Sequence, residues 1–123
     1  MMQALIVEDE LALQILYERI LANVDYEVVS AQDGNCAIQK LEQGFMPRLI
    51  IIGIRMPNCN GIEVLEYLKT YPHIHDVHVV IATASRDFED YATMLPSCEF
   101  LLKPVLSPHL LEIVKRLQPV QDI

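Results

Sequence analysis

The chain has 123 residues, of which 52% are hydrophobic and 21% are charged, and its formal net charge is -8. This length is enough for one domain with a buried core, and the hydrophobic content excludes a disordered chain. The excess of acidic residues and the lack of a basic cluster argue against direct binding to nucleic acid, because affinity for phosphate backbones comes largely from Lys and Arg. We therefore expect one acidic domain that spans residues 1–123.

Neither a membrane span nor a signal peptide is expected. No apolar run approaches the roughly 20 residues that cross a bilayer. The N-terminus, MMQALIVEDE, has no basic segment and turns acidic at once. The three cysteines, Cys36, Cys59 and Cys98, are odd in number and lack metal-type spacing. They favour reduced thiols in a cytoplasmic protein.

Strand patterns and helix patterns alternate along the chain. Two acids, Asp9 and Glu10, stand where the first helix would begin, which suits the N-terminus of a helix. The second helix has Asp33 as a plausible N-cap and Gly44 as its stop. In chain order the expected elements are strand 3–7, helix 9–23, strand 26–31, helix 35–43, strand 49–54, helix 62–70, strand 77–82, a short and weak helix 87–95, strand 100–102 and helix 107–117.

The third expected strand, LIIIGI, is apolar throughout and runs into a loop that contains Pro57 and Gly61. A short apolar run between turn residues is typical of a strand buried on both faces, as in a parallel sheet. Five such strands alternating with helices predict an α/β fold, in which right-handed crossovers bring all strand C-termini to one edge. That edge would carry Glu8, Asp9, Gly53, Thr83 and Lys103.

Four segments at these strand ends carry a resemblance to a known family. They are IVEDE (residues 6–10), IRMPNCNG (54–61), ATAS (82–85) and FLLKP (100–104). In order and spacing they resemble the receiver domain of bacterial two-component response regulators, over essentially the whole chain. The resemblance implies a flavodoxin-like, doubly wound sheet with strand order 2-1-3-4-5. It also implies phosphorelay signal transduction, in which a sensor kinase histidine passes a phosphoryl group to an Asp at the tip of strand three, with Mg²⁺ present.

The acceptor position of that family pattern is occupied by a glycine. The family's Asp lies three residues before the Met-Pro pair, and that position is Gly53 in this chain. No Asp or Glu occurs between Glu42 and Glu63 that could take its place. An acyl phosphate needs a carboxylate nucleophile, so the sequence predicts a receiver that cannot be phosphorylated at the usual position.

The resemblance implies that Glu8, Asp9 and the backbone carbonyl of Arg55 would hold Mg²⁺. Loss of the acceptor carboxylate removes one attraction for the cation, so we expect Mg²⁺ binding to be weakened. Lys103 would contact the phosphoryl group and the acceptor in the family. Without that acceptor we expect it to pair with Asp9 or Glu8 and so partly neutralise the pocket. The family often has a cis peptide bond at Lys103-Pro104.

Thr83 and Phe100 match the family's switch pair, a hydroxyl that bonds the phosphoryl oxygen and an aromatic ring that swings inward behind it. We expect these positions to be equivalent but not to switch on phosphorylation, because the bound oxygen that biases the switch cannot form. His73, His75 and His78 are interpreted as surface histidines rather than as a metal site.

The sequence therefore predicts an atypical receiver, or pseudo-receiver, that is not an enzyme and acts through protein contacts. A sensor histidine kinase or another signalling protein is the expected partner, near residues 11–16 and 103–106. A homodimer could form through the face of residues 87–117. The alternatives are an ordinary Mg-dependent phospho-accepting response regulator with a substitution at Gly53, a receiver-like module that binds a small ligand or an anion, and an enzyme that hydrolyses phosphate esters.

Overall fold

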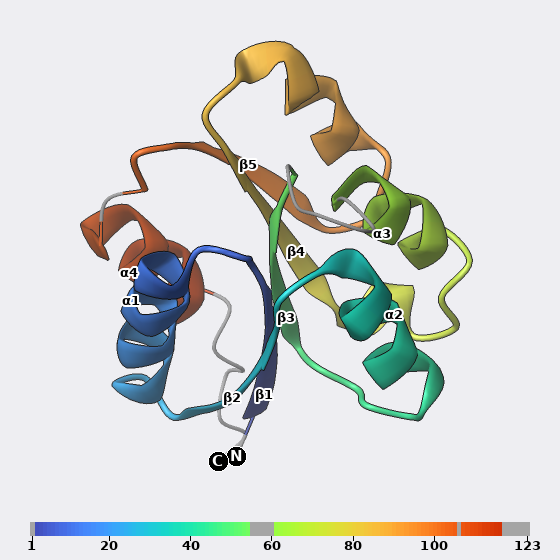
Figure 1. Cartoon of the computed structure of the whole chain (residues 1–123), viewed down its shortest axis with the longest axis horizontal. Helices are drawn as coiled ribbons and strands as arrows, with labels where there is room; N and C mark the ends of the chain where they lie inside the picture. Colours follow the sequence, from blue (N-terminus) through green and yellow to red (C-terminus); the bar gives the residue numbers. More distant parts are fainter. Residues whose placement is uncertain (1, 55–60, 106, 117–123) are drawn as a thin grey trace.

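The computed structural model describes residues 2–54, 61–105 and 107–116, and its five strands form one parallel sheet (Figure 1). The strand order is β2-β1-β3-β4-β5, which confirms the expected fold class and strand order. The elements in chain order are β1 Met2–Val7, α1 Leu11–Ala22, β2 Tyr26–Ala31, α2 Gly34–Glu42, β3 Leu49–Gly53, α3 Gly61–Leu68, the 3₁₀ helix η1 Ile74–Asp76, β4 His78–Thr83, the 3₁₀ helix η2 Arg86–Thr93, β5 Cys98–Leu102 and α4 Ser107–Arg116.

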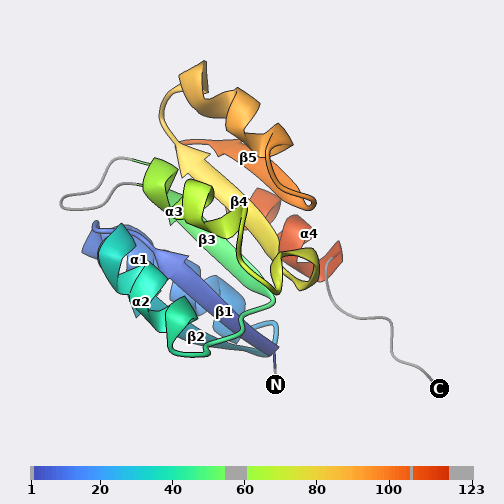
Figure 2. The same cartoon turned by 90° about the vertical axis from the view of Figure 1, so that its right-hand side faces the viewer.

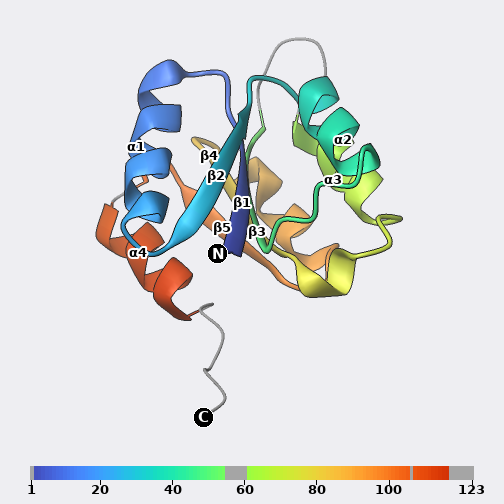
Figure 3. The same cartoon turned by 90° about the horizontal axis from the view of Figure 1, so that it is seen from below.

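Helices cover both faces of the sheet. Figure 3 shows α1 and α4 on one side of the strands and α2 and α3 on the other. Side chains of β1 alternate between the two layers, with Leu5 and Val7 in the core under α2 and α3, and Ala4 and Ile6 in the core under α1 and α4. All five residues of β3 are buried, as expected for a central parallel strand.

All five strands point the same way, so their C-terminal ends lie at one edge of the sheet (Figure 2). The register sets the neighbours at this edge, because Gly53 pairs with Ala82 and Thr83 pairs with Leu102. Across the described residues, no helix combines the length and apolar character that crossing a membrane requires.

Two expected helix boundaries are confirmed, one by a side-chain cap and one by a glycine, and a third is wrong. Asp33 caps α2 as expected, since its carboxylate accepts the Cys36 N–H at 2.8 Å. Gly44 follows that helix with φ of 101°, a left-handed conformation that favours glycine. The expected start of the first helix at Asp9 was wrong, because Glu10 is extended and α1 begins at Leu11. Glu8 and Asp9 therefore lie in a loop.

The segment expected as a short, weak helix over residues 87–95 is the 3₁₀ helix η2, which begins at Arg86. None of its residues is fully buried, although Phe88, Tyr91 and Ala92 pack partly against the core under α2 and α3. The strand expected over residues 100–102 begins earlier, at Cys98. The last expected helix ends at Arg116 within the described residues, and Leu117 lies outside them.

Candidate functional site

The strand ends form an open pocket of about 410 Å³ at the C-terminal edge of the sheet. β1 leads into Glu8, β4 ends at Thr83, and β5 leads into Lys103. The pocket is lined by Glu8, Asp9, Glu10, Ile54, Ala82, Thr83, Ala84, Ser85 and Lys103. Four of the residues that the sequence placed at this edge thus share one pocket, and Gly53 directly precedes Ile54 of the lining.

Glu8 is the most buried charged residue in the described part of the chain, with 2% of its surface exposed. Its Oε1 lies 3.2 Å from the Lys103 Nζ, and its Oε2 accepts the Glu10 N–H at 3.2 Å. Burial raises the pKa of Glu8, and the Glu10 N–H and the Lys103 charge oppose that rise. The expected ion pair of Lys103 is therefore made with Glu8.

The Glu8 carboxylate occupies the space beside Gly53. A Cβ atom added at residue 53 would lie 3.1 Å from Glu8 Oε1 and 3.5 Å from the Val7 carbonyl oxygen. A side chain at this position would thus require the Glu8 carboxylate to shift. A second glycine is needed for close approach at this edge, because a Cβ at Gly61 would lie 2.2 Å from the Gly53 carbonyl oxygen.

Lys103 and Thr83 are fixed to each other through the backbone. The Lys103 N–H donates to the Thr83 carbonyl at 2.8 Å, and the bond from Lys103 to Pro104 is cis, as the family resemblance led us to expect. The Thr83 side chain is buried and its Oγ1 accepts the Ser85 N–H at 3.4 Å. The Thr83 hydroxyl and the Lys103 ammonium therefore both line the pocket.

Phe100, the other half of the expected switch pair, does not line this pocket. Its ring is half-buried and packs against the core under α2 and α3. Arg55, whose carbonyl was expected to bind Mg²⁺, lies outside the described residues. Within the described part, no group of three or more His, Cys, Asp or Glu side chains is arranged to hold a metal ion. Three carboxylates, those of Glu8, Asp9 and Glu10, line the pocket, and Glu8 and Asp9 are the two that the sequence predicted as ligands.

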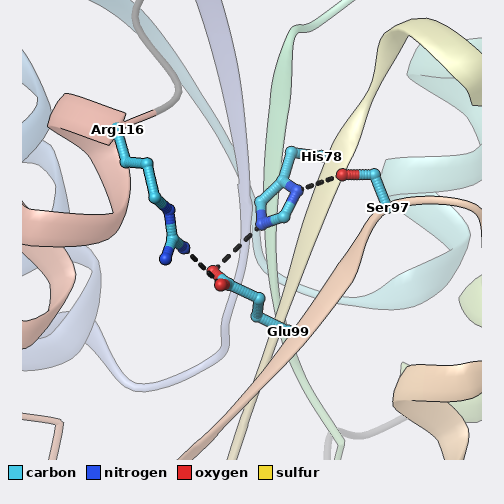
Figure 4. A network of polar contacts seen from close by, with 4 residues as sticks. All are labelled: His78, Ser97, Glu99 and Arg116. Carbon is cyan, nitrogen blue, oxygen red and sulfur yellow. Dashed lines mark hydrogen bonds and ion pairs between the residues drawn. The ribbon is translucent and has the colours of Figure 1, made fainter.

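A polar cluster that sequence reasoning missed lies at the opposite ends of the strands (Figure 4). The ring of His78, at the start of β4, contacts the Ser97 hydroxyl through Nδ1 and lies 3.1 Å from Glu99 Oε2 through Nε2. The other Glu99 oxygen pairs with Arg116 at the end of α4. The interpretation of His78 as a surface residue was wrong, since its side chain is only 12% exposed. The cluster fastens the end of α4 to the sheet.

Tyr17, on α1, is a second residue that the sequence did not single out. Its side chain is fully buried, and within the described residues its hydroxyl is the one buried side-chain polar atom without a hydrogen-bond partner. Burial and the negative charges of Glu8 and Glu10 raise the pKa of Tyr17 far above its ordinary value. An aromatic at helical spacing gives no sequence signal beyond a core position, so this feature needed the structure.

Comparison with known proteins connects this pocket to one family. A model of the response regulator receiver domain matches residues 4–115. An uncharacterized response regulatory protein of Vibrio cholerae is 33% identical over 118 residues, which cover 94% of this chain and 44% of that protein. The regulator of RpoS of Escherichia coli K12 is 36% identical over 103 residues, which cover 84% of this chain and 30% of that protein. The chain thus spans less than half the length of these curated relatives.

A similar solved structure is that of the response regulator protein TrrA from Thermotoga maritima, in complex with Mg²⁺ and BeF. It is 27% identical, with a TM-score of 0.81 over 95% of this chain and 99% of that one. The likeness covers the sheet and helices that build the pocket. It also links this arrangement of strand ends to a protein whose structure holds Mg²⁺.

Proposed function

Because the chain belongs to the response regulator receiver domain family of two-component systems, we propose that it is a pseudo-receiver within that family. Such a domain is not phosphorylated at the usual position and signals through protein contacts. Gly53, at the tip of β3, is the observation that carries this proposal. A glycine offers no carboxylate for an acyl phosphate, and the carboxylate beside it, that of Glu8, is bound to Lys103.

The rest of the pocket supports loss of the phosphoacceptor alone rather than loss of the whole receiver site. Thr83 and Lys103 still line the pocket together, and Glu8 is buried between them and Gly53. We propose that Mg²⁺ binds at most weakly here, since the acceptor carboxylate that would share in its coordination is missing. Phe100 keeps the switch position but receives no phosphoryl signal.

The exposed apolar side chains of α1 support a partner surface beside the pocket. Leu11 is 67% exposed and Ile15 is 40% exposed, and they lie one helical turn apart on the same side of α1. Leu102 is a third exposed apolar side chain, next to Lys103. We propose that a sensor histidine kinase or another signalling protein binds here. The face formed by η2, β5 and α4 is the proposed surface for a homodimer.

The proposal also includes a cytoplasmic location and no catalytic turnover. Cys36 and Cys98 are free thiols, which suits a reducing compartment. Hydrolysis of a phosphate ester would need a nucleophile at the pocket and a metal held by several acids. We therefore do not propose this activity for the chain. Binding of an anion is disfavoured, because Glu8, Asp9 and Glu10 outnumber Lys103 in the lining.

The test compares the wild-type protein with Gly53→Asp, each incubated with acetyl phosphate and Mg²⁺ and analysed by intact mass. The Gly53→Asp variant is expected to gain a hydroxylamine-sensitive phosphoryl adduct, and the wild type is not. Gly53→Asn is the matched control, since it has nearly the same size without the carboxylate. A phosphoryl adduct on the wild-type protein would contradict the proposal. If Gly53→Asp is not modified either, the pocket has lost more of the receiver site than the acceptor carboxylate.

The same experiment bears on the second candidate function, an ordinary phospho-accepting response regulator that carries a substitution at residue 53. The observation that favours it is the retained pairing of Thr83 and Lys103 at the pocket. Rapid phosphorylation of Gly53→Asp by a sensor kinase of the same cell, together with an Asp codon at position 53 in the source gene, would support this candidate over the pseudo-receiver.

A further inference from the structure

The Glu8–Lys103 ion pair stands where a receiver would hold its metal ion. We propose that the Lys103 ammonium is the resident cation of this pocket, so that the domain keeps one neutralised arrangement that neither requires nor responds to Mg²⁺. This inference deepens the proposed function and rests on it. It is carried by the contacts of Glu8, of Lys103 and of Gly53.

Both oxygens of the Glu8 carboxylate are already engaged. Oε1 lies 3.2 Å from Lys103 Nζ, and Oε2 accepts the Glu10 N–H at 3.2 Å. Mg²⁺ demands near-octahedral oxygen ligands and gives up its water reluctantly. Each carboxylate oxygen can accept more than one partner, but a cation bound to Glu8 would share it with the Lys103 ammonium and the Glu10 N–H. Asp9 and Glu10 are the other acids at the pocket.

Lys103 is held in position by the end of the sheet. Its N–H donates to the Thr83 carbonyl at 2.8 Å, so the base of the side chain is fixed beside β4. Its side chain is 22% exposed, and its ammonium faces a carboxylate that is almost fully buried. A divalent cation at the Glu8 carboxylate would meet this positive charge at close range, and like charges repel each other there.

The missing side chain at residue 53 leaves room for the Glu8 carboxylate in this arrangement. A Cβ there would lie only 3.1 Å from Glu8 Oε1, so the carboxylate uses space that an acceptor side chain would fill. An Asp at residue 53 would add a negative charge next to Glu8 and compete with it for Lys103. With glycine at residue 53, Lys103 thus pairs with Glu8 without a competing carboxylate at that position.

The test measures whether the folded domain responds to Mg²⁺. Thermal denaturation of the whole chain is followed with EDTA and with about 10 mM MgCl₂, which raises the melting temperature of any folded state with a Kd well below that concentration. The wild-type melting temperature is expected to stay the same. Lys103→Met, which frees the Glu8 carboxylate, is expected to melt several degrees higher with Mg²⁺ than without it.

Controls keep this test decisive. Lys115→Met makes the same change in net charge at an exposed position of α4 and should not respond to Mg²⁺. Lys103→Gln, which can still donate a hydrogen bond to Glu8, serves if Lys103→Met does not fold.

An NMR experiment locates the bound cation, with paramagnetic Mn²⁺ in place of Mg²⁺. Broadening of amide signals around Glu8 and Thr83 is expected in the Lys103 variants and not in the wild type.

Two results would overturn the inference: a wild-type melting temperature that rises with Mg²⁺, or folded Lys103 variants that gain no more response than Lys115→Met. These results differ from failure of the proposed function. A wild-type protein that binds Mg²⁺ but takes up no phosphoryl group would remove this inference and the proposed weakness of Mg²⁺ binding, and would leave the proposal that residue 53 cannot be phosphorylated. A phosphorylated wild type would overturn the proposed function itself.

Discussion

At the scale of single residues, position 53 determines more than the presence of a nucleophile. With no side chain on Gly53, the Glu8 carboxylate lies against the strand end and meets Lys103 there. Breaking such a pair from one side is costly, because it leaves a buried charge without compensation. The position that lacks the acceptor therefore lies beside an ion pair whose carboxylate is buried.

Tyr17 provides a prediction at the same scale. Its hydroxyl is fully buried without a hydrogen-bond partner among the described residues, so it contributes a desolvation cost and no compensating bond. We expect Tyr17→Phe to leave the free energy of unfolding unchanged or to raise it by up to about 1 kcal/mol, measured by urea denaturation.

Tyr71→Phe is the matched control for Tyr17→Phe. Tyr71 is also buried, but its hydroxyl donates to the Phe45 carbonyl at 3.3 Å. The control is expected to lose about 0.5–1.5 kcal/mol of stability, the usual net contribution of one hydrogen bond. If Tyr17→Phe lost as much as Tyr71→Phe, the Tyr17 hydroxyl would have a partner, such as a buried water molecule.

At the scale of elements, α2 is a helix whose start depends on one side chain. The Asp33 carboxylate accepts the Cys36 N–H at 2.8 Å, which satisfies one of the free donors at the helix N-terminus. We expect Asp33→Ala to lower the free energy of unfolding by about 1 kcal/mol, as measured by urea denaturation. Asp33→Asn keeps a capping oxygen and should lose much less. Equal losses in the two variants would show that the contribution is not the cap.

The sequence predicts helices and strands well where the hydrophobic pattern is clear. It predicts them poorly where tertiary contacts determine the conformation or the boundary of an element. The apolar run of β1 and the uniform burial of β3 could be recognised, and so could the Asp33 cap. The start of α1 could not, because Glu10 is held extended next to a carboxylate that pairs with a residue 95 positions away. The 3₁₀ conformation of η2, none of whose residues is fully buried, likewise could not be recognised from the sequence pattern.

The candidate site shows the same division. Its members were identified from the strand ends and the family motifs, because topology alone brings the strand C-termini together. The choice of Glu8 rather than Asp9 as the partner of Lys103 could not be predicted, since it depends on which carboxylate turns into the space beside Gly53. The contacts of His78 with Ser97 and Glu99 were missed because strand register, not sequence spacing, makes them neighbours.

At the scale of the whole molecule, the two ends of the sheet carry different groups of polar side chains. The C-terminal ends of the strands carry the pocket, and the N-terminal ends of β4 and β5 carry the cluster that fastens α4 (Figure 4). Energetic effects of substitutions at well-separated sites add nearly independently. The pocket should therefore keep its chemistry when the cluster is weakened.

Glu99→Gln in the Gly53→Asp background tests this separation. Glu99 is 30% exposed and bonds both His78 and Arg116, so its neutralisation is expected to lower the free energy of unfolding by about 1 kcal/mol in urea denaturation. The rate at which acetyl phosphate modifies Asp at residue 53 should not change, and the stability losses of the two substitutions should add within about 0.5 kcal/mol. A slower phosphorylation rate, or strong non-additivity, would instead mean that α4 transmits the state of the cluster along the sheet to Lys103.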